Sequence, residues 1–176
     1  MPGKNDQVTE RDADLFTISR TFDVSRDTMF DLWTSPHHLL HWWGPKGFAV
    51  KSATVDLRPG GKFHYCLAAP DGSDMWGRFV YRTIDKPRLL EFISSFSDPE
   101  GGVTIHPMAP AWPREMFSRI TFEEHHGQTT VTVEWRPFNA TEIERKTFLD
   151  GKTSMKQGWT GTLDMLEAYV KKIASA

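Results

Sequence analysis

The sequence predicts an α+β fold in which a curved seven-stranded antiparallel sheet wraps around a long C-terminal helix, with two short helices after strand one. Apolar and polar residues alternate in seven segments, as they do in half-buried strands. Turn-forming residues separate most of these segments by short gaps. The last segment has apolar residues at helical spacing, and it is the only long helix available to cover the apolar face of the sheet.

The N-terminal part predicts one strand and two helices. Residues 15–22 alternate in character and are predicted to form the first strand. Ser25 is a suitable N-cap for a helix over residues 26–33. Ser35 and Pro36 begin a second short helix, because serine can cap it and proline at its first position loses no hydrogen bond. Gly44 and Pro45 then end that helix.

Six further strands are predicted, near 48–57, 62–68, 74–85, 88–97, 115–125 and 129–137. Their separators include Gly60–Gly61, Pro70–Gly72, Lys86–Pro87 and Gly127. Charged residues on these strands, such as Glu91, Arg119 and Glu134, are interpreted as cross-strand pairs on the wet face.

The segment from Asp98 to Arg114 is predicted to lack regular structure, because it contains four prolines and two glycines. Irregular connections of this length often carry function. Met108 and Trp112 would give the segment an apolar underside, so we interpret it as a lid over one end of a cavity.

The final helix is predicted to begin after Thr141, which forms a capping box with Glu144. Gly151 is a candidate break, and Gly158 and Gly161 are predicted to admit close approach of another backbone segment. The apolar stripe that should face the sheet advances by four, four, three, four and three residues: Met155, Trp159, Leu163, Leu166, Val170 and Ile173.

The length of 176 residues fits one domain, predicted at 15–176 after a flexible tail over residues 1–14. The net charge of −2 does not favour nucleic acid or an anionic membrane surface as a partner. Cys66 is the only cysteine, so no intrachain disulfide can form. Neither a signal peptide nor an apolar run long enough to span a membrane is evident, and we expect a cytoplasmic protein.

The aromatic content predicts a ligand cavity. The chain has seven Trp and 12 Phe but three Tyr, and small-molecule sites are mostly apolar and aromatic. Alternation and helical phase place a set of side chains toward such a cavity, although core packing would explain many of them equally well. The candidate ligand-binding residues are Trp42, Trp43, Phe63, Tyr65, Leu67, Phe79, Tyr81, His106, Met108, Trp112, Met155 and Trp159.

No catalytic set and no cofactor or metal site is predicted. His37 and His41 have a spacing that can hold a metal, but no third ligand lies nearby in the sequence. The serines form no nucleophile elbow. Cys66 lies within a strand and is interpreted as a buried, unreactive thiol.

Several local strings resemble one family. They are His41-Trp-Trp-Gly-Pro45, Asp56-Leu-Arg-Pro-Gly-Gly61, Pro70-Asp-Gly72, Asp85-Lys-Pro87 and Gln157-Gly-Trp159. The chain resembles the helix-grip superfamily of START domains, polyketide cyclases and the birch pollen allergen. It looks most like the branch named for the activator of Hsp90 ATPase, over about residues 15–172.

The resemblance implies a domain that binds a small hydrophobic or aromatic molecule, as a monomer or homodimer. Two alternatives remain open. One is an enzyme of polyketide cyclase or aromatase type, in which a cavity Tyr, His or Arg orients the substrate. The other is a module that contacts a chaperone.

Overall fold

The fold is taken from a computed structural model, which describes residues 14–175. Its elements are β1 (Phe16–Phe22), α2 (Arg26–Thr34), α3 (Pro36–Trp42), β2 (Ala49–Val55), β3 (Lys62–Ala68), β4 (Asp74–Asp85), β5 (Leu89–Ser97), β6 (Val103–Thr104), β7 (Glu115–His125), β8 (Gln128–Phe138), α4 (Glu142–Asp150) and α5 (Lys152–Ala174). The predicted tail over residues 1–14 lies outside the described residues except for Asp14, and the domain boundary stays a prediction.

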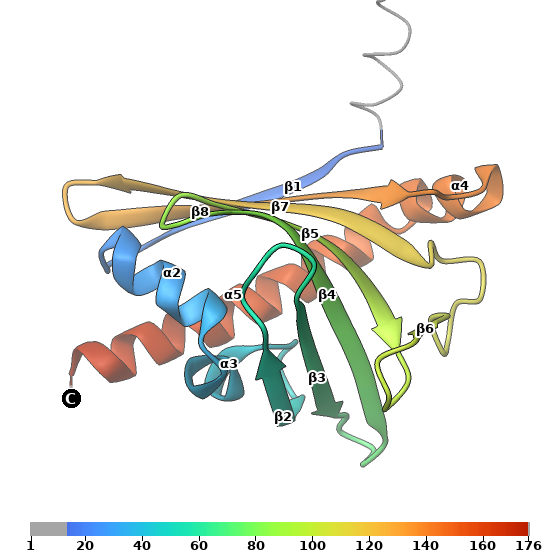
Figure 1. Cartoon of the computed structure of the whole chain (residues 1–176), viewed down its shortest axis with the longest axis horizontal. Helices are drawn as coiled ribbons and strands as arrows, with labels where there is room; N and C mark the ends of the chain where they lie inside the picture. The colour runs from blue at the N-terminus through green and yellow to red at the C-terminus, as the bar shows by residue number, and fades with distance from the viewer. Residues whose placement is uncertain (1–13, 176) are drawn as a thin grey trace, which may run out of the picture.

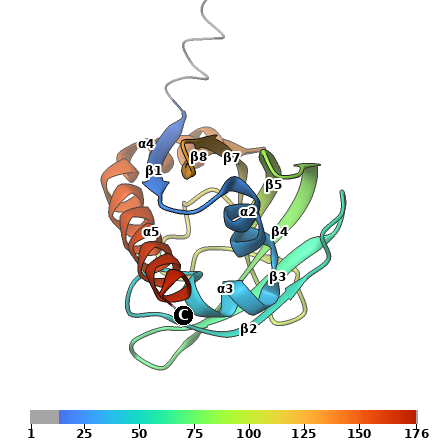
Figure 2. The ribbon, with the colours of Figure 1, turned by 90° about the vertical axis from the view of Figure 1, so that its left-hand side faces the viewer.

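The seven predicted strands form one antiparallel sheet in the order β1-β8-β7-β5-β4-β3-β2. The sheet is curled, and α5 runs along its open side (Figures 1 and 2). The predicted α+β helix-grip arrangement is therefore confirmed. One difference lies in the segment 98–114, where the short β6 pairs with β5 and gives the segment a small piece of regular structure.

Consecutive strands β1 and β2 lie at opposite edges of the sheet, and α2 and α3 make the connection between them (Figure 2). The Ser25 side chain caps α2 by accepting a hydrogen bond from the Thr28 backbone N–H at 3.3 Å. Ser35 occupies the N-cap position of α3, with Pro36 next to it, but its side chain forms no capping hydrogen bond. The predicted role of Ser35 as a side-chain cap is therefore wrong.

The C-terminal helix is divided as the sequence indicated. The capping box of Thr141 and Glu144 starts α4, and Gly151 separates α4 from α5. The stripe on α5 packs into the concave side of the sheet, where Leu163 and Leu166 are fully buried. Gly161 approaches the backbone of Lys46, since a Cβ there would lie 3.4 Å from the Lys46 nitrogen. Gly158 has no such neighbour, so the prediction of close approach holds for Gly161 and is wrong for Gly158.

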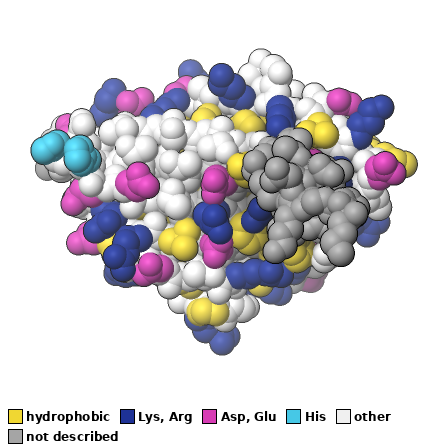
Figure 3. Space-filling model, turned by 90° about the horizontal axis from the view of Figure 1, so that it is seen from above, with side chains coloured by type: hydrophobic (Ala, Val, Ile, Leu, Met, Phe, Trp, Pro, Cys, Tyr) yellow, Lys and Arg dark blue, Asp and Glu magenta, His cyan; other side chains and the backbone are white. Residues whose placement is uncertain are grey.

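The surface above β1, β7 and β8 carries many charged side chains (Figures 1 and 3). Basic and acidic side chains are interspersed on the face shown in Figure 3. Within the part of the chain that the structure describes, no helix combines the length and apolar character needed to cross a bilayer.

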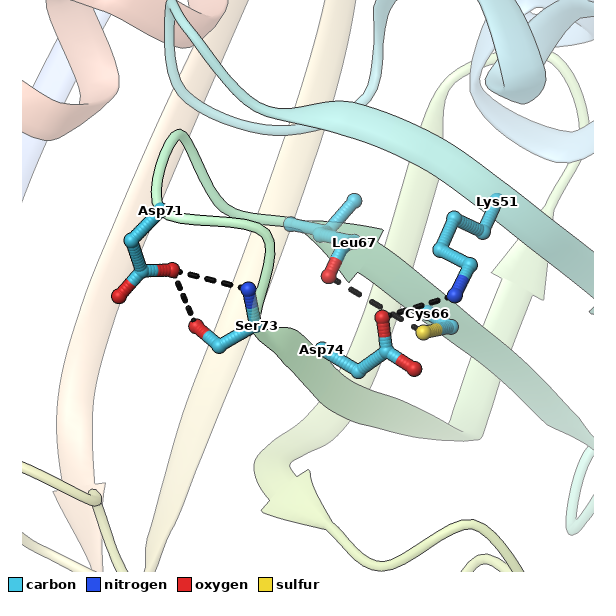
Figure 4. Close-up of polar contacts among 6 residues, drawn as sticks. All are labelled: Lys51, Cys66, Leu67, Asp71, Ser73 and Asp74. Carbon is cyan, nitrogen blue, oxygen red and sulfur yellow. Dashed lines mark hydrogen bonds and ion pairs between the residues drawn. The ribbon is translucent and has the colours of Figure 1, made fainter.

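Cys66 alternates on β3 with the cavity-lining Tyr65 and Leu67, and it is 2% exposed. The ion pair between Lys51 Nζ and Asp74 Oδ1, at 2.8 Å, lies beside it, next to the β3–β4 turn in which Asp71 accepts two hydrogen bonds from Ser73 (Figure 4). Burial raises the pKa of the Cys66 thiol, and the Asp74 carboxylate raises it further. The thiolate is disfavoured in this environment, which agrees with an unreactive thiol.

Candidate ligand-binding cavity

A cavity of about 220 Å³ lies between the concave face of the sheet and α5. Apolar and aromatic side chains dominate its lining. The residues that line it are Trp43, Gly44, Pro45, Tyr65, Leu67, Met75, Phe79, Ser94, Ser95, Phe96, Trp112, Pro113, Arg114, Met116, Trp135, Met155, Gly158, Trp159 and Thr162. For scale, an engineered apolar cavity of roughly 150 Å³ is large enough to bind benzene.

The structure brings part of the predicted site together at this cavity. Seven of the candidate residues line it: Trp43, Tyr65, Leu67, Phe79, Trp112, Met155 and Trp159. They come from the end of α3, from β3 and β4, from the segment before β7, and from α5. Residues that are distant in the sequence thus converge on one cavity.

The other five candidates lie elsewhere. Trp42, Phe63 and Tyr81 are packed in the core at 1%, 0% and 1% exposure. Trp42 does not line the cavity as predicted, because its indole nitrogen points into the core and donates to the Leu32 carbonyl oxygen at 2.9 Å. His106 packs on Phe96, with ring centroids 4.8 Å apart, and does not reach the cavity lining.

Met108 is 87% exposed, so it does not form the apolar underside that the sequence predicted. Trp112 supplies that contact instead. Its ring lies 5.8 Å from Phe148, and a Cβ on Gly151 would come within 2.9 Å of its Cζ3 atom. Gly151 therefore both separates α4 from α5 and leaves room for the Trp112 ring.

Several lining residues were not among the predicted set. Met75, Ser94, Phe96, Met116 and Trp135 project inward from strands, whereas Pro113 and Arg114 precede β7. Alternation offered a usable signal for some of them, since Phe92, Ser94 and Phe96 share one face of β5. Arg114 offered no periodic signal, because it lies in the irregular segment.

Trp43 and Trp159 form the centre of the aromatic lining. The Trp43 ring meets Tyr65, Phe79 and Trp159 edge to face, with centroids 5.6, 5.3 and 6.0 Å away. Trp159 also meets Trp135 at 5.2 Å. Edge-to-face contacts of this kind stabilise aromatic clusters beyond the area that they bury. These contacts hold the rings of Trp43 and Trp159 in place on their side of the lining.

Tyr65 lies over Gly77, its partner across the β3–β4 ladder. A Cβ at position 77 would come within 2.3 Å of the Tyr65 Cζ and Oη atoms. Glycine is thus needed here to let the phenol ring lie flat against the sheet. Burial raises the pKa of the Tyr65 hydroxyl to about 12, partly offset by the Trp43 indole N–H. The phenol therefore stays protonated at neutral pH.

The polar groups of the lining differ in whether they have partners. Ser94 Oγ lies 3.2 Å from Ser118 Oγ, and Thr162 Oγ1 donates to the Gly158 carbonyl oxygen at 3.1 Å. The indole nitrogens of Trp43 and Trp135 are buried without a hydrogen-bond acceptor of suitable geometry. Among the described residues that line the cavity, Arg114 alone carries a charge.

Three histidines cluster away from this cavity. The rings of His37 and His41 are 5.7 Å apart, His41 stacks on Tyr169 at 5.1 Å, and His38 Nδ1 lies 2.8 Å from the Tyr169 hydroxyl. Burial lowers the pKa of His38, and the neighbouring His37 lowers it further. Over residues 14–175, no group of three or more His, Cys, Asp or Glu side chains is arranged to hold a metal ion.

Solved structures share this fold. A protein from Mycobacterium smegmatis is 26% identical, with a TM-score of 0.70 over 89% of this chain and 90% of that one. Proteins from Arthrobacter aurescens and Nitrosomonas europaea are 24% and 21% identical, with TM-scores of 0.75 and 0.72. Their alignments cover 92% and 93% of this chain and 88% and 98% of theirs, and they show the fold alone. No curated protein sequence matches the chain.

The profile of one protein family matches residues 23–171 and so spans α2 through most of α5. This match includes the Trp-Trp-Gly-Pro string after α3 and the Gly-Trp string in α5. It confirms the resemblance that these strings predicted. The chain belongs to the family described as Activator of Hsp90 ATPase homolog 1-like protein.

Proposed function

We propose that this protein binds a small hydrophobic or aromatic molecule in the cavity between its sheet and α5. The observation that carries the proposal is the cavity of about 220 Å³ with aromatic rings on several sides. Small-molecule sites are concave and are lined mostly by apolar and aromatic side chains with a few polar groups, as this cavity is.

The family and the fold support a ligand-binding or chaperone-associated domain in general. The cavity favours the first of these two roles. The exposed large apolar side chains are distributed over several elements, including Leu40 on α3, Met108 before β7 and Ile143 on α4. Scattered apolar residues of this kind are ordinary on a protein surface and identify no docking site.

An enzyme of cyclase or aromatase type is the second candidate, and the Tyr65 hydroxyl at the cavity favours it. With a pKa of about 12, this phenol can donate a hydrogen bond at neutral pH but is a weak base. A Tyr65→Phe variant separates the two roles. If the protein only binds ligand, this variant should still bind it, and no product should form in either protein.

Calorimetric titration with a neutral aromatic probe, 2-naphthamide, tests the proposal. Gly158 lines the cavity and a Cβ there meets open space, so Gly158→Leu should fill the cavity and weaken binding at least about tenfold. Gln157→Leu adds the same side chain at an exposed position of the same helix and should leave the affinity unchanged. Equal affinities in these two variants would place the binding site elsewhere.

Native mass spectrometry of the purified protein is an independent test. A copurifying small molecule that is lost from Gly158→Leu and retained by Gln157→Leu would identify the natural ligand. Binding of 2-naphthamide by neither the wild type nor any variant would contradict the proposed function.

A further inference from the structure

We propose that the ligand of this cavity is an aromatic carboxylic acid, whose ring system lies among the indole and phenol side chains and whose carboxylate pairs with Arg114. The inference rests on the proposed function and names the chemical class of ligand. It follows from the polar groups that remain without partners around an otherwise apolar space.

The Trp135 indole N–H and the Ser95 hydroxyl belong to lining residues and are buried without a partner, and both can donate a hydrogen bond. The Trp43 indole N–H lacks a hydrogen bond of standard geometry, but it interacts with the Tyr65 hydroxyl, whose pKa it lowers. The Tyr65 phenol is protonated at neutral pH and can donate as well. A buried donor without a partner is costly, so a bound ligand that supplies oxygen acceptors would be favoured over a pure hydrocarbon.

Arg114 adds a positive charge to this set. It is exposed to solvent and also lines the cavity, which places it at an opening rather than in the interior. Among the described residues, no carboxylate lies within ion-pair distance of its guanidinium group. A guanidinium offers a planar fork of donors that matches a carboxylate, and the resulting bonds are stronger than neutral ones.

Glu144 is the acidic residue near Arg114, and its two oxygens are already engaged. Oε1 accepts from the Thr141 backbone N–H at 3.2 Å, and Oε2 accepts from the Arg114 backbone N–H at 3.1 Å. Burial opposes ionisation of Glu144, but these hydrogen bonds and the nearby charge of Arg114 outweigh it and hold the pKa of Glu144 below the usual range. Glu144 thus fixes the backbone at position 114 and attracts the Arg114 charge, but it forms no close ion pair with the guanidinium group.

The same lining disfavours other charged ligands. Among the described residues around the cavity, none is acidic, so an ammonium group would enter without a counter-charge and beside Arg114. A carboxylate buried among the rings would also be costly, but at the opening it keeps contact with water and with the guanidinium. A molecule with a carboxylate at one end of a flat ring system can keep its charge at the opening, beside Arg114, and place its rings inside the cavity.

Two probes of nearly equal shape test the inference: 2-naphthoate, which is ionised at pH 7, and the neutral 2-naphthamide. By calorimetry at low ionic strength, the wild type should bind the acid about three- to fivefold more tightly than the amide. Arg114→Gln should remove this preference while the affinity for the amide stays within about twofold. Arg114→Lys should keep part of the preference, because it keeps the charge without the planar fork.

Arg88→Gln is the matched control, since Arg88 is an exposed arginine in the β4–β5 turn and does not line the cavity. It should leave the preference for the acid unchanged. The side-chain N–H resonances of Trp43 and Trp135 should shift when 2-naphthoate binds, and added salt should reduce the preference.

The outcomes separate this inference from the proposed function. Equal affinities of the wild type for the two probes, or an undiminished preference in Arg114→Gln, would overturn the assignment of an acid and leave a cavity for neutral ligands. Binding of neither probe would overturn both. Loss of the preference in Arg114→Gln alone, with amide binding retained, would establish Arg114 as the residue that selects the acid.

Discussion

Trp159 connects the C-terminal helix to the aromatic cluster under the sheet. It is 6% exposed and contacts Trp33, Trp43 and Trp135, with ring centroids 6.4, 6.0 and 5.2 Å away. Trp159→Ala should lower the free energy of unfolding by about 3–5 kcal/mol, because it removes a buried aromatic ring and enlarges a cavity. Urea denaturation measures the loss. Ile143→Ala, at a position 72% exposed, should change stability by at most about 0.5 kcal/mol.

Gly77 and Tyr65 are neighbours across the β3–β4 pair, and the Tyr65 ring lies over Gly77. Gly77→Ala should destabilise the protein by about 1–3 kcal/mol and weaken probe binding, since the new methyl group displaces the Tyr65 ring from the sheet. In a Tyr65→Ala background the same substitution should cost little. A double-mutant cycle measures this coupling. Additive effects of the two substitutions would mean that the Tyr65 ring is not what occupies the space above Gly77.

At the scale of elements, α5 combines helix formation with cavity lining. Gly158 is interior to the helix, where glycine is less favourable than alanine by roughly 0.8–1.0 kcal/mol. Because a Cβ at this position meets no neighbour, Gly158→Ala should stabilise the ligand-free protein by about 0.5–1 kcal/mol in thermal or urea unfolding. It should also reduce the affinity for 2-naphthamide. An unchanged stability would show that the helix is strained at this position.

A row of charged side chains, formed by Glu91 on β5, Arg119 on β7 and Glu134 on β8, predicts that the stability of the protein depends on pH. Arg119 donates to Glu91 Oε2 from Nε at 2.9 Å and from Nη2 at 2.8 Å, and its Nη1 lies 3.7 Å from Glu134 Oε2. Burial raises the pKa of Glu91, but the hydrogen bonds and the charge of Arg119 outweigh it and lower the pKa overall. The ionised form of Glu91 is therefore the one that the folded state favours.

A carboxyl group with a lowered pKa in the folded state stabilises the protein at pH values above its unfolded pKa of roughly 4.3. That contribution is lost as the pH falls through the folded-state pKa. At pH 7, Glu91→Gln should be less stable than the wild type by about 1 kcal/mol, given that Arg119 is partly exposed. Urea midpoints measured from pH 7 to pH 3 should converge. A constant difference across this range would exclude the carboxylate as its source.

At the scale of the whole molecule, local patterns were sufficient for the elements and insufficient for the cavity. Alternation, caps and turn residues depend on near neighbours, so the strands and helices other than β6 could be predicted from the sequence. Which inward side chain meets the cavity depends on sheet curvature and on register across several strands. Trp42 and Trp43 are adjacent, yet one donates to a core carbonyl and the other lines the cavity. Phe63 and Tyr65 share a face of β3, yet only Tyr65 is in the lining.

Local sequence patterns were also insufficient for the segment 98–114. This segment consists of two parts. Its first part is tied to the sheet, since β6 pairs with β5 and Arg78 Nη1 donates to the Gly101 carbonyl oxygen at 2.7 Å. Its second part holds exposed Met108 and the cavity-lining Trp112 within short local turns. Proline and glycine content predicts irregular backbone for both parts alike. It carries no information about which of them the sheet fixes.

Because the sheet holds only the first part of the segment, the prediction of a lid now applies to residues 105–112. If residues 105–112 open to admit ligand, their amide hydrogens should exchange faster than those of the flanking strands in the ligand-free protein. Saturating 2-naphthamide should slow exchange in 105–112, because Trp112 would then pack against the bound ring. Exchange in 98–104, which the sheet already holds, should stay the same and serves as the internal control. If the probe binds and exchange in 105–112 does not change, the segment is a fixed cover, and ligand must enter the cavity by another route.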